Sequence, residues 1–329
     1  MELALSIAPV IVFLLFLFLL DSFKLVIYKI LVLSVLWGAL SAVIAYFVNI
    51  LLLENEHLSF ETLSQYLAPA SEEILKSVFI FLIVRKKQVG FLIDAAIYGF
   101  AIGAGFALVE NIFYLQNTTD SNLLVWIIRG FGTALMHGGC TSLFAIILVG
   151  AKGRDKSGLA SIILAYLTAY IIHSAFNHFY ISPVFQTLGV IIIYPIVFIS
   201  IFKFNENQLQ NWLEIEFNSE IELLNMIKRG EFGSTRAGEY LTSLKSRFSG
   251  ETILDMYCYI QIYLDLSVKA KRNLMLKENG FPVIIEDDID GKLAEMNELK
   301  KRIGKVGEIT LSPLIQMNYR DLWKLNSLK

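Results

Sequence analysis

Carboxylate, imidazole and amide side chains recur in four apolar stretches of this sequence. The stretches contain the runs SEEILK, FALVEN, MHGGCT and HSAFNH, and their candidate residues are Glu72, Glu73, Lys76, Phe106, Glu110, Asn111, His137, Thr141, His173 and Asn177. A charged group inside hydrocarbon is unfavourable unless it is paired or faces water, so each is a candidate for function. This set predicts hydrolysis of a peptide bond, which needs an activated water, a proton carrier and donors for the oxyanion.

The carboxylate that activates the water is predicted to be one of the adjacent pair Glu72 and Glu73. The other is expected to be a structural or metal-binding partner, and either assignment is open. Lys76 lies four residues after Glu72, which is the spacing of an ion pair along one helical face.

The two histidines leave two alternatives open for a cofactor. His137, His173 and Glu110 are the donor types of a three-ligand zinc site with an open water position. Without a metal, His173 and Asn177 would donate hydrogen bonds to the oxyanion, and a glutamate alone would activate the water. The HExxH zinc motif is absent, so Zn²⁺ is an alternative and not a requirement.

Helical spacing predicts that these side chains meet. Residues four apart share a helical face, and this spacing relates Glu72 to Lys76, Phe106 to Glu110, His137 to Thr141, and His173 to Asn177. With a rise of about 1.5 Å per residue, the polar groups of the four stretches lie roughly 18–30 Å from the cytoplasmic ends of their helices. One polar layer in the outer half of the membrane is therefore expected.

Composition indicates the elements that must position this layer. The 329 residues are 55% hydrophobic and only 18% charged, a charged fraction well below that of a soluble domain. The net charge of −2 provides no basic surface for nucleic acid, and that class of partner is excluded. The fold class predicted is all-α, a polytopic membrane helix bundle followed by a small cytoplasmic helical domain.

Seven apolar stretches are long enough to cross about 30 Å of hydrocarbon as helices. They cover approximately residues 3–20, 25–53, 67–84, 91–115, 122–150, 158–180 and 184–202. Cations follow every second stretch, at Lys24 and Lys29, Arg85 to Lys87, Lys152, Arg154 and Lys156, and Lys203. Because cations in short loops stay in the cytoplasm, the N-terminus is predicted outside and the C-terminus inside.

The sequence predicts two domains, a transmembrane bundle at 1–203 and a cytoplasmic helical domain or extension at 204–329. The second region has 17 of the 28 basic residues and 19 of the 30 acidic residues. Apolar residues recur every three or four positions at Ile253, Tyr257, Ile260, Leu264 and Val268, as in an amphipathic helix. This region is a candidate binding site for a cytoplasmic partner.

The runs EEILK, FALVEN and HSAFNH, with the histidine between them, resemble the motifs EExxK, FxxxE and HxxxD or HxxxN of the PrsW family of glutamate-dependent intramembrane proteases. That family is related to the CAAX-processing and bacteriocin-processing endopeptidases. The resemblance covers residues 67–180, in the order of the family's motifs.

The resemblance implies a multi-pass protease in the plasma membrane of a prokaryote. Its substrate would be a single-pass membrane protein, cut near the outer face of the membrane, such as an anti-sigma factor. By the same resemblance the active-site residues would be Glu72, Glu73, Glu110, His137, His173 and Asn177, supported by Lys76, Phe106 and Asn111. Asn177 stands where some family members have Asp, and a neutral amide favours an oxyanion or positioning role.

Two other functions use similar residues. A proton- or ion-coupled transporter also places Glu, Lys and His inside the membrane, but it predicts inverted repeats, and none is evident in this sequence. A membrane scaffold that presents the C-terminal region to a partner leaves the intramembrane carboxylates unexplained.

Overall fold

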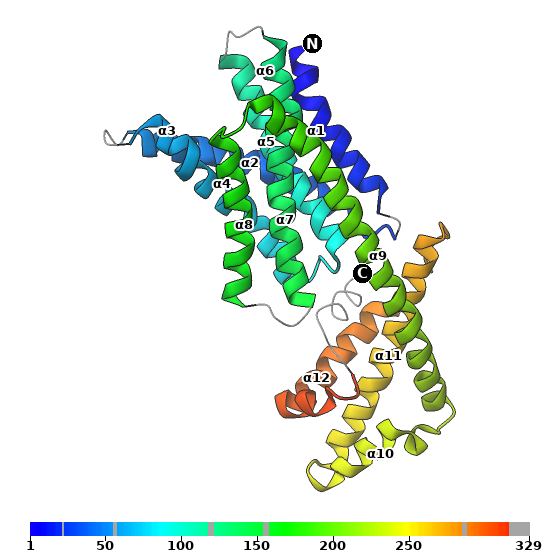
Figure 1. Cartoon of the computed structure of the whole chain (residues 1–329). Coiled ribbons are helices and arrows are strands. Elements are labelled where there is room, and N and C mark those ends of the chain that lie inside the picture. The colour runs from blue at the N-terminus through cyan, green and yellow to red at the C-terminus, as the bar shows by residue number, and fades with distance from the viewer. Residues whose placement is uncertain (22, 55–57, 118–121, 154–157, 285–287, 316–329) are drawn as a thin grey trace. The chain divides into compact units, whose positions relative to one another are not determined.

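The computed structural model describes residues 1–329 without 22, 55–57, 118–121, 154–157, 285–287 and 316–329. The described chain contains helices and no strands. It divides into two compact units, Met1–Asn205 and Glu206–Lys329. The helices are shown in Figure 1.

The first unit is a bundle of helices joined by short connections. In chain order the elements are α1 (Glu2–Leu19), α2 (Tyr28–Leu53), α3 (Phe60–Thr62), the π-helix η1 (Leu63–Leu67), α4 (Ala68–Arg85), α5 (Leu92–Asn117), α6 (Leu123–Ile127), the π-helix η2 (Ile128–Thr133), α7 (Ala134–Gly153), α8 (Leu159–Asn177) and α9 (Pro183–Lys228), whose first part belongs to this unit. Helices satisfy their own backbone hydrogen bonds, which lipid cannot do for them.

Six helical segments of the described chain have the length and apolar composition of membrane spans. They are Glu2–Leu19, Tyr28–Leu53, Leu92–Asn117, Leu123–Lys152, Leu159–Asn177 and Pro183–Asn207. The chain is therefore a multi-pass membrane protein with an all-helical fold.

The expected count of seven spans differs from this result at 67–84. That stretch forms the helix α4, but its 18 residues include Glu72, Glu73, Lys76 and Arg85, too many charges for an apolar span. Neighbouring helices cover its charged face, since Lys76 is fully buried and Glu73 is 2% exposed. The predicted side of each terminus stays a prediction, and two of the cations that support it, Arg154 and Lys156, lie outside the described residues.

Helix α5 forms the centre of the first unit. Nearly all its residues from Ile93 to Ala107 are buried, and it packs against α1, α2 and α7. The contact with α7 is close because Gly103 has no side chain, and a Cβ atom there would overlap the backbone carbonyl of His137. The position of His137, a candidate site residue, therefore depends on Gly103.

Substituting Gly103 with Ala is expected to destabilise the bundle by about 1–3 kcal/mol, because the added methyl group forces α5 and α7 apart. Unfolding of the purified protein in mixed micelles measures the change. Gly150→Ala on α7 is the matched control, since a Cβ atom there would lie at an ordinary 3.5 Å from Leu92. Equal stability of the two variants would contradict the close contact.

The second unit is also helical. After the end of α9 it contains the 3₁₀-helix η3 (Phe232–Ser234), α10 (Arg236–Ser243), the 3₁₀-helix η4 (Leu244–Ser246), α11 (Gly250–Glu278) and α12 (Ile289–Leu311). Thr235 and Ser249 cap α10 and α11 by accepting hydrogen bonds from backbone N–H groups. The predicted amphipathic stripe lies on α11, where Ile260 and Leu264 belong to the core of this unit. Its cytoplasmic location stays a prediction.

Candidate active site

A buried ion pair within α4 is linked by a hydrogen bond to α8. The ammonium of Lys76 donates a hydrogen bond of 2.8 Å to Glu73 Oε1. The same oxygen accepts from His173 Nδ1 at 2.8 Å. Glu73 and His173 are each 2% exposed, so the Glu73 carboxylate is enclosed by its two partners. Because Nδ1 is the donor here, the Nε2 atom of His173 is the free nitrogen.

The imidazole of His137 connects this pair to α5. Its Nδ1 atom lies 2.8 Å from Lys76 Nζ, and its Nε2 atom lies 2.9 Å from Glu110 Oε2. An ammonium is only a donor, so Nδ1 accepts and Nε2–H donates to Glu110. The ring also lies edge-on to His173, with centroids 4.7 Å apart. Four helices thus contribute to one network of charged groups.

Glu72 lies at the edge of this network. Its Oε2 atom is 3.8 Å from His173 Nε2 and 3.9 Å from Lys76 Nζ. Glu72 and Asn49 on α2 line the same cavity. Glu72 is 13% exposed, in contrast to its buried neighbour Glu73.

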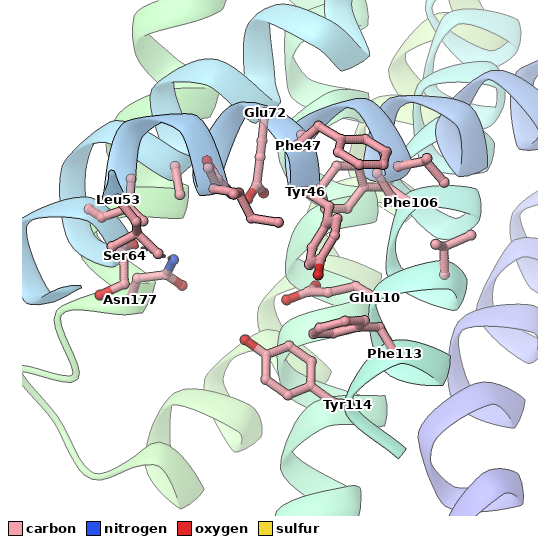
Figure 2. A pocket seen from close by; sticks show the side chains of 18 of the residues that line it. Tyr46, Phe47, Leu53, Ser64, Glu72, Phe106, Glu110, Phe113, Tyr114 and Asn177 are labelled. Carbon is pink, nitrogen blue, oxygen red and sulfur yellow. Dashed lines mark hydrogen bonds between the residues drawn. The ribbon is translucent and has the colours of Figure 1, made fainter. Parts of the chain in front are cut away.

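A cavity of about 530 Å³ opens beside Glu72 and Glu110. Figure 2 shows both carboxylates reaching towards it from α4 and α5, with Asn177 at another part of the wall. Most of the remaining wall is apolar or aromatic, and its rings are Tyr46, Phe47, Phe60, Phe106, Phe113 and Tyr114. The cavity therefore combines carboxylates with surroundings suited to apolar side chains.

Of the other predicted residues, Phe106 and Asn177 lie at the network or the cavity, and Thr141 bonds to its own helix. The Phe106 ring lies under Lys76, with Nζ 4.1 Å from its centroid, and packs against His137. Asn177 lines the cavity and donates to the carbonyl of Ser64 at 3.0 Å. The Thr141 hydroxyl instead donates to the His137 carbonyl of its own helix.

Asn111 has its hydrogen-bond partners on α1 and η2. Its side chain donates to the carbonyl of Ser6 on α1 at 2.7 Å and accepts from Arg129 Nε at 3.0 Å. Asn111 therefore supports the site through Arg129.

Two residues that the sequence did not assign to the site also belong there. Arg129 forms an ion pair of 3.2 Å with Glu110. Asn49 lines the cavity beside Glu72. The amide of Asn49 within the apolar run of α2 is the signal for it in the sequence.

Comparison with known proteins identifies the membrane part of the chain. A family model described as PrsW family intramembrane metalloprotease matches residues 27–201. The chain belongs to the PrsW family. No curated protein and no solved structure matches it. The match confirms the resemblance seen in the motifs and makes the chain an intramembrane peptidase by family.

The PrsW match includes the two π-helices, each of which precedes a helix of the site. In η1, the carbonyls of Ser64 and Gln65 accept hydrogen bonds from Asn177 and Ser174 on α8. π-Helical turns interrupt the regular backbone pattern and often occur at functional sites. Here η1 ties the start of α4 to α8, while η2 contains Arg129 and leads into α7.

The description of the PrsW family as metalloproteases raises the question of whether the site can hold an ion. Single donor atoms of Glu72, His137 and His173 lie within 4.8 Å of one another. Two imidazoles and a carboxylate are the donor set of many catalytic zinc sites. The sequence-based set had Glu110 in place of Glu72, and the structure instead places Glu110 against His137 Nε2.

The environment of the two imidazoles agrees with this donor set. Glu73 holds His173 through Nδ1 and leaves Nε2 free, which is the carboxylate–histidine arrangement found behind many metal ligands. The Nδ1 atom of His137 is occupied by Lys76, so Nε2 is the atom that could bind an ion. Binding an ion through Nε2 would replace the hydrogen bond from this atom to Glu110. The residues present thus fit a zinc-type ion.

Proposed function

We propose that the chain is a glutamate-dependent endopeptidase that cuts a membrane-anchored protein inside the membrane, near its outer face. The observation that carries the proposal is the pair of carboxylates, Glu72 and Glu110, on one cavity backed by His137 and His173. Membership of a protease family favours this function over the transporter alternative.

The structure supports different roles for the two adjacent glutamates. Glu72 faces the cavity, where water and a peptide carbonyl can approach it. Glu73 is enclosed by Lys76 and His173 and has no such access, so it is the positioning partner that holds the His173 ring. Asn177, in the wall of the same cavity, donates one N–H to the Ser64 carbonyl, and the second N–H of its amide is the donor we assign to an oxyanion.

Glu72, His137 and His173 would hold a zinc-type ion in this proposal. Such an ion, when bound, supplies positive charge that polarises a water molecule or a carbonyl oxygen. Glu110, the second carboxylate on the cavity, then accepts the proton of the attacking water and carries it to the leaving amine. Arg129 holds Glu110 in place for that transfer.

Elemental analysis of the purified protein tests the metal assignment. We expect about one zinc per chain in the wild type and less than about a tenth of that in a His137→Ala, His173→Ala double variant, because two of three ligands are lost. His178→Ala is the control, since its Nδ1 lies 2.6 Å from the Ser174 carbonyl of its own helix, apart from this donor group. Wild-type protein without metal would refute the ion and leave Glu72 as the base.

The substrate we propose is a single-pass membrane protein such as an anti-sigma factor, in the plasma membrane of a prokaryote. The apolar and aromatic cavity wall supports a substrate that presents apolar side chains next to the scissile bond. Comparing membrane proteomes of cells that produce the wild type or Glu72→Gln tests the function. A substrate should appear as a fragment only with the wild type, and identical proteomes would refute the proposal.

A further inference from the structure

Arg129 makes three contacts to α5, with the adjacent residues Glu110 and Asn111 and with Tyr114 one turn later. Its Nε donates to Asn111 Oδ1 at 3.0 Å, its Nη2 lies 3.2 Å from Glu110 Oε1, and its guanidinium lies 3.6 Å from the centre of the Tyr114 ring. The planar guanidinium suits this combination of carboxylate, amide and aromatic face. Arg129 is 16% exposed, so most of its side chain is enclosed by these partners.

The Glu110 carboxylate is held from both sides as a result. One oxygen faces Arg129 and the other faces His137 Nε2 at 2.9 Å. A carboxylate with only the imidazole as partner would be free to rotate about its side-chain bonds into the cavity. Arg129 therefore fixes the direction from which Glu110 meets His137.

Helix α1 precedes the residues that the PrsW family model matches, and it contacts both Asn111 and the turn that contains Arg129. The match begins at residue 27, and α1 ends at Leu19. The carbonyl of Ser6 on α1 accepts from Asn111 Nδ2 at 2.7 Å, which orients the Asn111 oxygen that holds Arg129. At the next residue of η2, Gly130 lies directly against α1, and a Cβ atom there would overlap the carbonyl of Leu5.

We propose that Arg129 is the positioning residue for Glu110, and that α1 sets the position of Arg129 through Asn111 and the Gly130 contact. The inference rests on the proposed function, in which Glu110 accepts and delivers the proton. Arg129 itself touches Glu110, Asn111 and Tyr114 and acts through Glu110. Helix α1 then belongs to the catalytic unit, beyond its role as a membrane anchor.

The test compares variants of the full-length protein in lipid nanodiscs, with a single-pass reporter peptide as the substrate and zinc as the metal. Arg129→Gln should lower kcat about 10- to 100-fold and leave KM within about twofold, because apolar contacts bind the peptide and Glu110 acts on it afterwards. Zinc affinity should stay within about twofold of wild type, because the three proposed ligands Glu72, His137 and His173 are all retained. Arg129→Lys, which keeps the positive charge, should recover part of the loss in kcat.

Gly130→Val tests the contact between α1 and η2 and leaves the Arg129 side chain in place. It should push η2 away from α1 and lower kcat in the same direction. Arg85→Gln, at the exposed end of α4, is the matched control and should behave as wild type.

The outcomes separate the inference from the proposed function. Wild-type kcat in both Arg129→Gln and Gly130→Val would overturn the inference while the peptidase function stands. A loss confined to KM would overturn it as well, since positioning of Glu110 does not predict weaker peptide binding. A wild-type protein that neither cuts the peptide nor binds zinc would overturn the proposed function, and the inference with it.

Discussion

Replacing Glu72 with Gln is expected to lower the rate of reporter cleavage by about 10²- to 10⁴-fold. Gln keeps the size of the side chain, but it removes the negative charge beside His173. That charge is needed whether Glu72 holds an ion or takes a proton from water. The measurement is the amount of fragment released from a co-expressed single-pass reporter protein, with the amount of inserted enzyme determined in parallel.

Glu61→Gln on α3 is the matched control for this variant. Glu61 is exposed, and its carboxylate accepts a hydrogen bond from Gln65 on the neighbouring turn. Cleavage by this control should stay within about twofold of wild type, since surface substitutions rarely have large effects. Full cleavage by Glu72→Gln, at wild-type levels of inserted protein, would refute the role of this carboxylate.

Replacing Lys76 with Met is expected to abolish cleavage and to lower the free energy of unfolding by about 3–5 kcal/mol. Lys76 is fully buried, and its ammonium contacts Glu73, His137 and the face of Phe106. Its loss leaves the enclosed carboxylate of Glu73 without its cation, and a buried unpaired charge is strongly destabilising. Denaturation of the purified protein in SDS mixed micelles measures the change.

A double variant separates stability from catalysis. Glu73→Gln together with Lys76→Met removes both charges, so most of the lost stability should return, while cleavage should stay low because the His173 ring loses its charged partner. Lys29→Met, at an exposed position of α2, is the control and should leave both properties unchanged. A Lys76→Met protein as stable as wild type would contradict the buried ion pair.

Much of the architecture and of the candidate site could be predicted from the sequence. Composition and the length of apolar runs determine a membrane helix bundle, because lipid accepts only structures that satisfy their own backbone hydrogen bonds. Helical periodicity placed the polar residues of each stretch on one face, and the cost of charge in lipid made them candidates. The motifs around Glu72, Glu110 and His173 also pointed to the family that the comparison then showed.

The tertiary structure decided which partner each of these groups has. Glu72 and Glu73 are neighbours in sequence, yet about 100° of rotation around α4 places one on the cavity and encloses the other between Lys76 and His173. Periodicity specifies the face of a helix but neither the helix opposite it nor the side-chain direction, so the pairing of Arg129 with Glu110 required the packing of η2 against α1 and α5. The charges that serve the site also lower the hydropathy of α4. For this reason six helical segments of the described chain have the composition of a span, while the sequence analysis predicted seven spans including 67–84.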